Sequence, residues 1–177
     1  MMLADEGDNE DDIFVYMGGD QQVPERVRRA RIPKSLKIVP RRAFYRRMQL
    51  EYVEFHDDIQ MIEEEAFHFC VSLSGCIKLL GVKVIKESAF YYCQRLTDVE
   101  FGDKLETIEE NAFNGCTALK KIRMPSVRRI KYWAFFHCNE LSDVEFGQGL
   151  RTIHGWRRIR CLRRIGTNHL AIERQHH

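Results

Sequence analysis

The strongest feature of this sequence is a short motif that returns at an almost constant interval. An Ala-Phe pair, with a Cys three positions and a Leu six positions after the Phe, occurs four times. A fifth pair precedes these four by the same interval, with Arg47 in place of the Cys. Repetition at a period of about 20 to 50 residues is typical of solenoids, whose single units cannot bury a hydrophobic face alone. The pairs begin at Ala43, Ala66, Ala89, Ala112 and Ala134.

Other apolar residues recur at fixed offsets within each unit. In the segment from Leu96 to Phe101, the apolar Val99 and Phe101 alternate with polar residues, as in a strand with one buried face. Ile108, Ala112 and Phe113 are spaced by four and five positions, which predicts a short helical or 3₁₀ segment on the opposite side. We therefore expect an α/β or mainly β solenoid of stacked units, with short strands on one face and short helical or 3₁₀ segments on the other. The unit that follows Ala66 departs from the pattern, because Cys76 and Lys78 occupy apolar positions.

The repeats also suggest how the chain is divided. With 177 residues, 44% of them hydrophobic, it is long enough for one sizeable core, and we expect a single solenoid over 13–165. Within its N-terminal cap, Ile13 to Met17 is predicted to form a short strand that pairs with the first rung. The expected parts are a disordered acidic tail (1–12), an N-terminal cap (13–39), regular repeats (40–153), a degenerate last repeat (154–165) and a disordered tail (166–177).

The last repeat lacks the Ala-Phe pair that its position predicts. A solenoid that ends without a polar cap exposes its core. We expect Trp156, Ile159 and Leu162 to form a frayed or adhesive end, through which two chains could associate.

Four of the six cysteines share one position in the repeat, beside a Phe of buried type. This spacing favours thiols that act as small core hydrophobes. Disulfide-bonded caps, which occur in extracellular repeat proteins, are the alternative, but the sequence shows no export signal. It also has no run of about 18 apolar residues, so we expect no membrane span and favour a cytoplasmic location. The repeated cysteines are Cys70, Cys93, Cys116 and Cys138.

The polar residues between the apolar ones define a candidate binding face. From rung to rung their charge runs basic, acidic, neutral, acidic, basic and acidic. Two compatible interpretations are open: opposite charges on adjacent rungs pair across the ladder, or the row contacts a partner of complementary pattern. In the second, Tyr52 and Ile77 form the less charged centre. The predicted face comprises Glu51, Tyr52, Glu54, Ile77, Thr97, Asp98, Glu100, Lys120, Lys121, Arg123, Asp143 and Glu145.

Arginines gather at both ends of the array. Clustered Arg can bind phosphates of RNA or of an anionic surface, although few aromatic residues accompany these clusters to stack on bases. The net charge of +2 gives no overall field that would favour nucleic acid. The N-terminal patch contains Arg28, Arg29, Arg31, Arg41, Arg42, Arg46 and Arg47, and the C-terminal cluster contains Arg157, Arg158, Arg160, Arg163 and Arg164.

The sequence offers little for catalysis. Its seven His show no metal-ligand spacing with the Cys, and no phosphate loop or nucleophile elbow is recognisable. We therefore predict no enzymatic activity, no catalytic residue, no metal and no cofactor.

The segment from Leu96 to Cys116, LTDVEFGDKLETIEENAFNGC, is similar to the BspA-type leucine-rich repeat, also called the Treponema pallidum type. The similarity extends from Val27 to Ile153. Proteins of this type occur as bacterial surface adhesins and in large sets in protists and unicellular algae. The resemblance implies a curved or twisted right-handed solenoid used for recognition, without catalytic residues. We expect a non-enzymatic scaffold that binds a protein on its strand-bearing face, with binding of nucleic acid or an anionic surface through the Arg-rich end rungs as the alternative.

Overall fold

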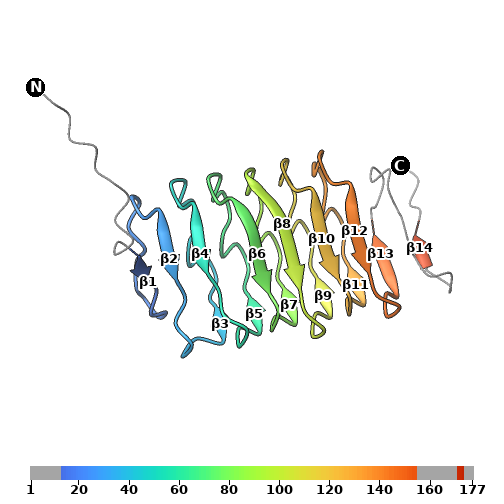
Figure 1. Ribbon diagram of the computed structural model, residues 1–177, viewed down its shortest axis with the longest axis horizontal. Coiled ribbons are helices and arrows are strands. Elements are labelled where there is room, and N and C mark those ends of the chain that lie inside the picture. Colours follow the sequence, from blue (N-terminus) through green and yellow to red (C-terminus); the bar gives the residue numbers. More distant parts are fainter. Residues whose placement is uncertain (1–12, 155–170, 174–177) are drawn as a thin grey trace, which may run out of the picture.

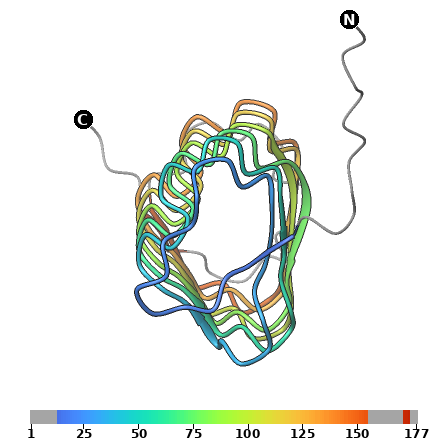
Figure 2. The ribbon, with the colours of Figure 1, turned by 90° about the vertical axis from the view of Figure 1, so that its left-hand side faces the viewer.

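The computed structural model of the chain describes residues 13–154 and 171–173, and every regular element in them is a β-strand. The rungs stack side by side along one axis (Figure 1) and form one continuous coil when viewed along it (Figure 2). All strand pairs in this part of the chain are parallel, and most join a strand to its equivalent one repeat away. One period of the motif thus corresponds to one turn of the coil, as the sequence predicts.

The strands form three sheets on two sides of the coil. One side carries a three-stranded sheet and a four-stranded sheet, and the other side carries a single seven-stranded sheet. The three-stranded sheet has the order β1 (Phe14–Val15), β2 (Arg29–Arg31), β4 (Tyr52–Glu54), and the four-stranded sheet the order β12 (Asp143–Phe146), β10 (Lys121–Met124), β8 (Leu96–Phe101), β6 (Gly75–Leu79). The seven-stranded sheet has the order β14 (Ala171–Glu173), β13 (Thr152–His154), β11 (Arg129–Ile130), β9 (Thr107–Ile108), β7 (Val84–Ile85), β5 (Met61–Ile62), β3 (Ile38–Val39).

A column of phenylalanine rings runs through the core. Phe44, Phe67, Phe90, Phe113 and Phe135 stack with centroid separations of 5.0 to 5.5 Å and interplanar angles of 5 to 8°. Tyr16 covers the N-terminal ring at 5.1 Å. The Phe that recurs in each unit therefore forms a continuous spine.

The repeated cysteines lie beside this spine as free thiols. Each thiol donates a hydrogen bond to the carbonyl of the Phe in the preceding rung, for example Cys93 Sγ to Phe67 O at 3.2 Å. Burial raises the pKa of Cys70 to about 12, so this thiol stays protonated and unreactive at neutral pH. In the unit that has Arg47 in the Cys position, Arg47 Nε donates to Val23 O at 2.6 Å. These thiols contribute hydrogen bonds between rungs as well as hydrophobic volume.

Turns occupy the third side, where we expected short helical or 3₁₀ segments. Two residues in each unit have positive φ: the residue before the Ala, such as Glu65 (56°), and the residue before the Cys, such as Phe69 (57°). A left-handed residue interrupts any right-handed helix. It also turns its N–H toward the next rung: Glu65 N donates to Glu87 O at 3.0 Å and Phe69 N to Tyr91 O at 2.8 Å. The turns thereby extend the hydrogen bonding between rungs to the side that has no sheet.

In the unit that follows Ala66, the structure differs from the sequence alignment. Ile77 and Leu79 are buried, whereas Cys76 and Lys78 are exposed. The reason is one additional residue before Ile77, accompanied by a register irregularity at Gly75/Cys76 where β6 meets β8. The unit regains the common register by shortening the turn after Leu79. Ile77 is consequently a core residue and does not belong to the predicted binding face.

The two ends differ from the regular rungs. Strand β1 pairs with β2, as predicted for the segment from Ile13 to Met17. At the other end, residues 171–173 form β14, which pairs with β13, although we expected a disordered tail over 166–177. The predicted acidic tail (1–12) and most of the degenerate repeat, including Trp156, Ile159 and Leu162, lie outside the described residues. No helix in the described part of the chain has the length and hydropathy of a membrane span.

Candidate protein-binding face

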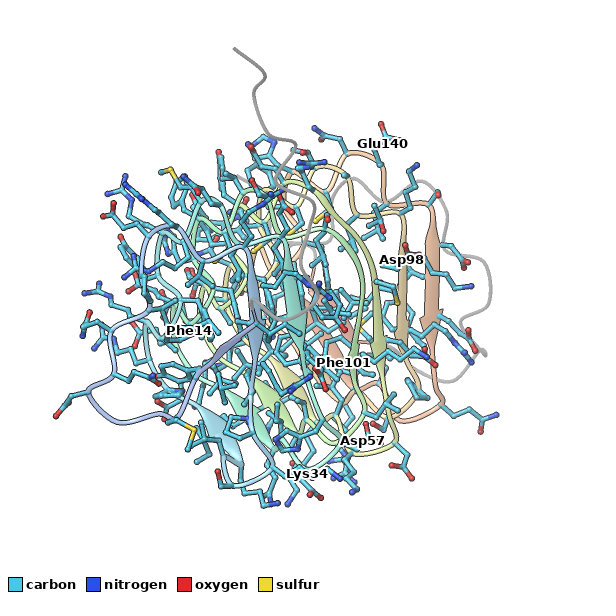
Figure 3. All side chains as sticks on the ribbon, turned by 60° about the vertical axis from the view of Figure 1, so that its left-hand side comes forward. Phe14, Lys34, Asp57, Asp98, Phe101 and Glu140 are labelled. Carbon is cyan, nitrogen blue, oxygen red and sulfur yellow. The ribbon has the colours of Figure 1, made fainter. Side chains whose placement is uncertain are left out.

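The outward residues of β2, β4, β6, β8, β10 and β12 form one surface, which we call the strand face. It includes Arg28, Glu51 and Lys120, which directly precede β2, β4 and β10. Parallel pairing in register places equivalent residues of adjacent rungs side by side: Arg29 lies opposite Tyr52, and Lys121 lies between Asp98 and Asp143. Asp98 and Phe101 mark the two sides of β8 (Figure 3), because Phe101 is buried in the core and Asp98 is partly exposed. The repeat thus converts sequence positions one period apart into neighbouring side chains.

Opposite charges pair across the strand face, as the first interpretation predicts. At the N-terminal end, Arg28 lies 3.0 Å from Glu51 and Arg31 lies 2.6 Å from Glu54. At the C-terminal end, Lys121 lies 3.2 Å from Asp143. All six side chains are at least 40% exposed, so each pair contributes only about 0 to 1 kcal/mol to stability.

Arg123 joins three rungs. Its guanidinium group lies 2.8 Å from Glu145 and 3.6 Å from Glu100. The hydrogen bond to Glu145 raises the pKa of Arg123 above its ordinary value. Thr97 is half-buried, whereas Asp98 and Lys120 form no ion pair among the described residues. These last two charges remain open to a partner.

Tyr52 is the large apolar side chain of the strand face. It is 46% exposed, and the guanidinium carbon of Arg29 lies 5.7 Å from its ring centroid. Of the two predicted central residues, Tyr52 therefore lies on the surface and Ile77, which is 4% exposed, does not.

The strand face is divided at its centre, which the sequence analysis missed. Strands β4 and β6 belong to different sheets, whereas β5 and β7 continue without a break on the opposite side of the coil. The spacing of four positions from Leu73 to Ile77, compared with three in the other units, is the sequence signal for this division. The exposed Cys76 lies there, and partial burial of its thiol, together with the nearby charges of Asp98 and Glu100, raises its pKa.

The predicted N-terminal basic patch is largely neutralised by the next rung. Besides Arg28 and Arg31, Arg41 lies 3.1 Å from Glu64, and Arg42 forms an ion pair with Glu65. The hydrogen bond from Arg42 holds the pKa of Glu65 below its ordinary value. The remaining patch residues are engaged in other ways: Arg29 and Arg46 stand over aromatic rings, and Arg47 bonds backbone carbonyls. The C-terminal cluster from Arg157 to Arg164 lies outside the described residues.

Aromatic residues cover part of the turn side, a feature that sequence reasoning did not single out. His68 lies 5.2 Å from Tyr45 and 4.7 Å from Tyr91, while Phe69 lies 5.1 Å from Tyr92 (centroid distances). Burial lowers the pKa of His68, which favours its neutral form. The signal was present in the sequence, because these residues occupy the two positions between the repeated Phe and Cys.

Side chains of potential metal ligands do not gather in the described part of the chain. No group of three or more His, Cys, Asp or Glu suited to a metal ion occurs there.

Comparison with known proteins agrees with the repeat. The model of the BspA type leucine rich repeat region matches residues 25–142 in six copies. A crystal structure of the Treponema pallidum leucine-rich repeat protein TpLRR is 29% identical, with a TM-score of 0.64 over 68% of this chain and 60% of that one. A leucine-rich repeat protein from Bacteroides ovatus is 23% identical, with a TM-score of 0.52 over 71% of this chain and 39% of that one, and supports the fold alone.

The chain therefore spans less than two thirds of the length of either relative. A comparison with curated proteins gave no match. Both the matched repeats and the geometry of the stacked rungs show that the chain belongs to the BspA-type leucine-rich repeat family.

Proposed function

We propose that this chain is a non-enzymatic scaffold that binds a protein partner on its strand face. The observation that carries the proposal is the row of exposed polar and charged side chains that parallel strands hold in register, with the exposed Tyr52 among them. Membership in a leucine-rich repeat family supports it, because these repeats generally mediate protein interactions.

The ion pairs on the strand face are compatible with partner binding. Exposed pairs are weak and screened by salt, so a partner can exchange them for contacts of its own at small cost. Tyr52 supplies the kind of aromatic anchor that often dominates an interface. The unpaired charges of Asp98 and Lys120 would favour a partner of complementary pattern.

Binding of nucleic acid or an anionic surface through the Arg-rich ends is the second candidate. The described N-terminal arginines are already engaged with Glu side chains, aromatic rings or carbonyls, which reduces what they can offer to phosphates. A salt titration with generic RNA separates the two candidates. Micromolar binding that falls steeply toward physiological salt would favour this second function.

The strand face is tested by exchanging the partners of its ion pairs. The variants Arg28→Glu/Glu51→Arg and Lys121→Asp/Asp143→Lys keep each pair but invert its direction on the surface. Arg41→Glu/Glu64→Arg is the matched control, since it exchanges an equally exposed pair that lies outside the strand face. Proteins captured from an extract of the source cells are compared by quantitative mass spectrometry.

The expected partner is captured by the wild type and by the Arg41/Glu64 exchange, and is lost with both strand-face exchanges and with Tyr52→Ala. Circular dichroism confirms that each variant is folded. Partners that remain with the strand-face variants but are lost with the control would show that another surface binds them.

A further inference from the structure

A pocket with an excess of positive charge lies on the outer side of the seven-stranded sheet, away from the strand face. Its volume is about 90 Å³, and it is lined by Glu106, Arg128, Arg129 and Arg151. Several water molecules or one tetrahedral oxyanion would fit in this volume. The lining residues carry three guanidinium groups and one carboxylate, an excess of two positive charges.

The pocket side chains come from three successive rungs. Arg128 N donates to Glu106 O at 2.9 Å, and Arg151 N donates to Arg128 O at 2.8 Å, so these three residues form one column. Arg129 is the outward residue of β11, and its Nε lies 3.4 Å from Thr107 Oγ1. The backbone N–H groups of Arg128 and Arg151 are thus used between rungs, and only side chains are available to a ligand.

The arrangement of charge differs from that on the strand face. There, oppositely charged residues such as Arg28 and Glu51 lie on adjacent rungs and pair. Here, Arg128 and Arg151 carry the same charge on adjacent rungs, which is unfavourable without a counterion between them. Among the described residues none of the three arginines forms an ion pair, whereas Arg31, Arg41, Arg42 and Arg123 all do.

We propose that this pocket binds a phosphate group, either as the free ion or as a monoester. Guanidinium groups match the oxygens of phosphate with paired, charge-assisted hydrogen bonds, and Arg128 and Arg151 can approach the same anion from neighbouring rungs. The bound anion relieves the repulsion between the two arginines.

Glu106 gives the pocket a preference among oxyanions. At neutral pH phosphate retains a proton and can donate a hydrogen bond to the Glu106 carboxylate, whereas sulfate has no proton to donate. Sulfate would therefore place an acceptor against an acceptor, which costs free energy. The four side chains together favour hydrogen phosphate over sulfate.

The test is a titration of the ¹⁵N-labelled protein with inorganic phosphate, sulfate and methyl phosphate at low ionic strength, with the arginine Nε–H signals as the readout. Phosphate should bind saturably and more tightly than sulfate. Arg128→Gln and Arg151→Gln should each weaken phosphate binding about tenfold, the effect of losing one charge-assisted contact at an exposed site. Arg95→Gln is the matched control, because Arg95 is an exposed arginine on the turn side.

Glu106→Gln distinguishes a built pocket from general attraction to positive charge. An amide can donate to sulfate, so this variant should bind sulfate severalfold more tightly and lose the preference for phosphate. Methyl phosphate and phosphate are compared at about pH 5.5, where most of the ester also keeps a proton because its second pKa is about 6. Equal binding supports a monoester ligand, whereas weaker binding of the ester supports the free ion. The absence of saturable phosphate binding, or an equal loss in Arg95→Gln, would overturn the proposal.

Discussion

Replacing Phe90 with Ala removes the middle ring of the phenylalanine spine. The ring is fully buried and stacks at 5.0 Å on Phe67 and at 5.1 Å on Phe113. Truncation of a buried Phe to Ala costs about 3 to 5 kcal/mol, including the cavity that remains. We expect the upper half of this range, because two stacking contacts of about 0.5 to 1.5 kcal/mol each are lost with the ring.

The rung cannot easily collapse into the cavity. Phe90 N donates to Ala112 O at 2.8 Å, and the Cys116 thiol donates to Phe90 O at 3.2 Å, so both polar groups of the Phe90 backbone are bonded to the following rung. Typical domains have about 5 to 15 kcal/mol of total stability, so the variant should lose a large part of it.

Urea denaturation followed by circular dichroism measures the total loss, and hydrogen exchange shows which rungs open first. Phe136→Ala is the matched control, because it makes the same chemical change at a ring that is 45% exposed. We expect the control to lose less than about 1 kcal/mol. Comparable losses in both variants, or unchanged exchange in the rungs beside Phe90, would refute the stacking argument.

Three further predictions concern other features of the fold. The first uses a Cys161→Ser background, which removes the one cysteine outside the described residues. In this background Ellman's reagent should label Cys76 before unfolding and the buried thiols only after it. Asp98→Asn should speed the labelling of Cys76, because removing this negative charge lowers the raised pKa of its thiol. Ser88→Gly should stabilise the protein by up to about 1 kcal/mol in urea denaturation, since φ at Ser88 is 53°, whereas Gly115→Ala should destabilise it, since its Cβ would lie 2.4 Å from the Tyr92 ring. Because Arg42 lowers the pKa of Glu65, the stabilisation from Glu65 is present at neutral pH and is lost as the pH falls through that lowered pKa. Glu65→Gln should therefore reduce stability at about pH 7 and leave it unchanged at about pH 2 in parallel urea titrations.

The sequence was sufficient to predict the stacked coil and its core, because side chains one period apart must repeat the same environment. It was not sufficient to predict the turns. Left-handed backbone is usually signalled by Gly or Asn, but Glu65 and Phe69 occupy such positions here, and hydrogen bonds to the next rung stabilise them. The apolar spacing that suggested a helix therefore belongs to a series of turns.

The candidate face was predictable only to the extent that the register was correct. A one-residue shift exchanges inside and outside in a strand, so one additional residue moved Ile77 into the core and Cys76 to the surface. The pocket of Arg128 and Arg151 was missed for a different reason. It lies beside the seven-stranded sheet, at a repeat position whose residue type varies along the array.

The order of charges along the strand face suggests a role in holding adjacent rungs together. Arg123 lies between Glu100 and Glu145, which belong to the rungs on either side of it. Its guanidinium group therefore attracts both carboxylates. Arg123→Glu would place three carboxylates on adjacent rungs and should destabilise the protein through repulsion. The repulsion is electrostatic and exposed, so the difference from wild type should shrink between about 0.1 M and 1 M NaCl, as the screening length falls from about 10 to 3 Å. Arg123→Gln removes the attraction without adding repulsion and should lie between the two at low salt. A loss of stability that is independent of salt would mean that Arg123 acts through packing of its side chain, and the alternation of charge would then have no part in ordering the rungs.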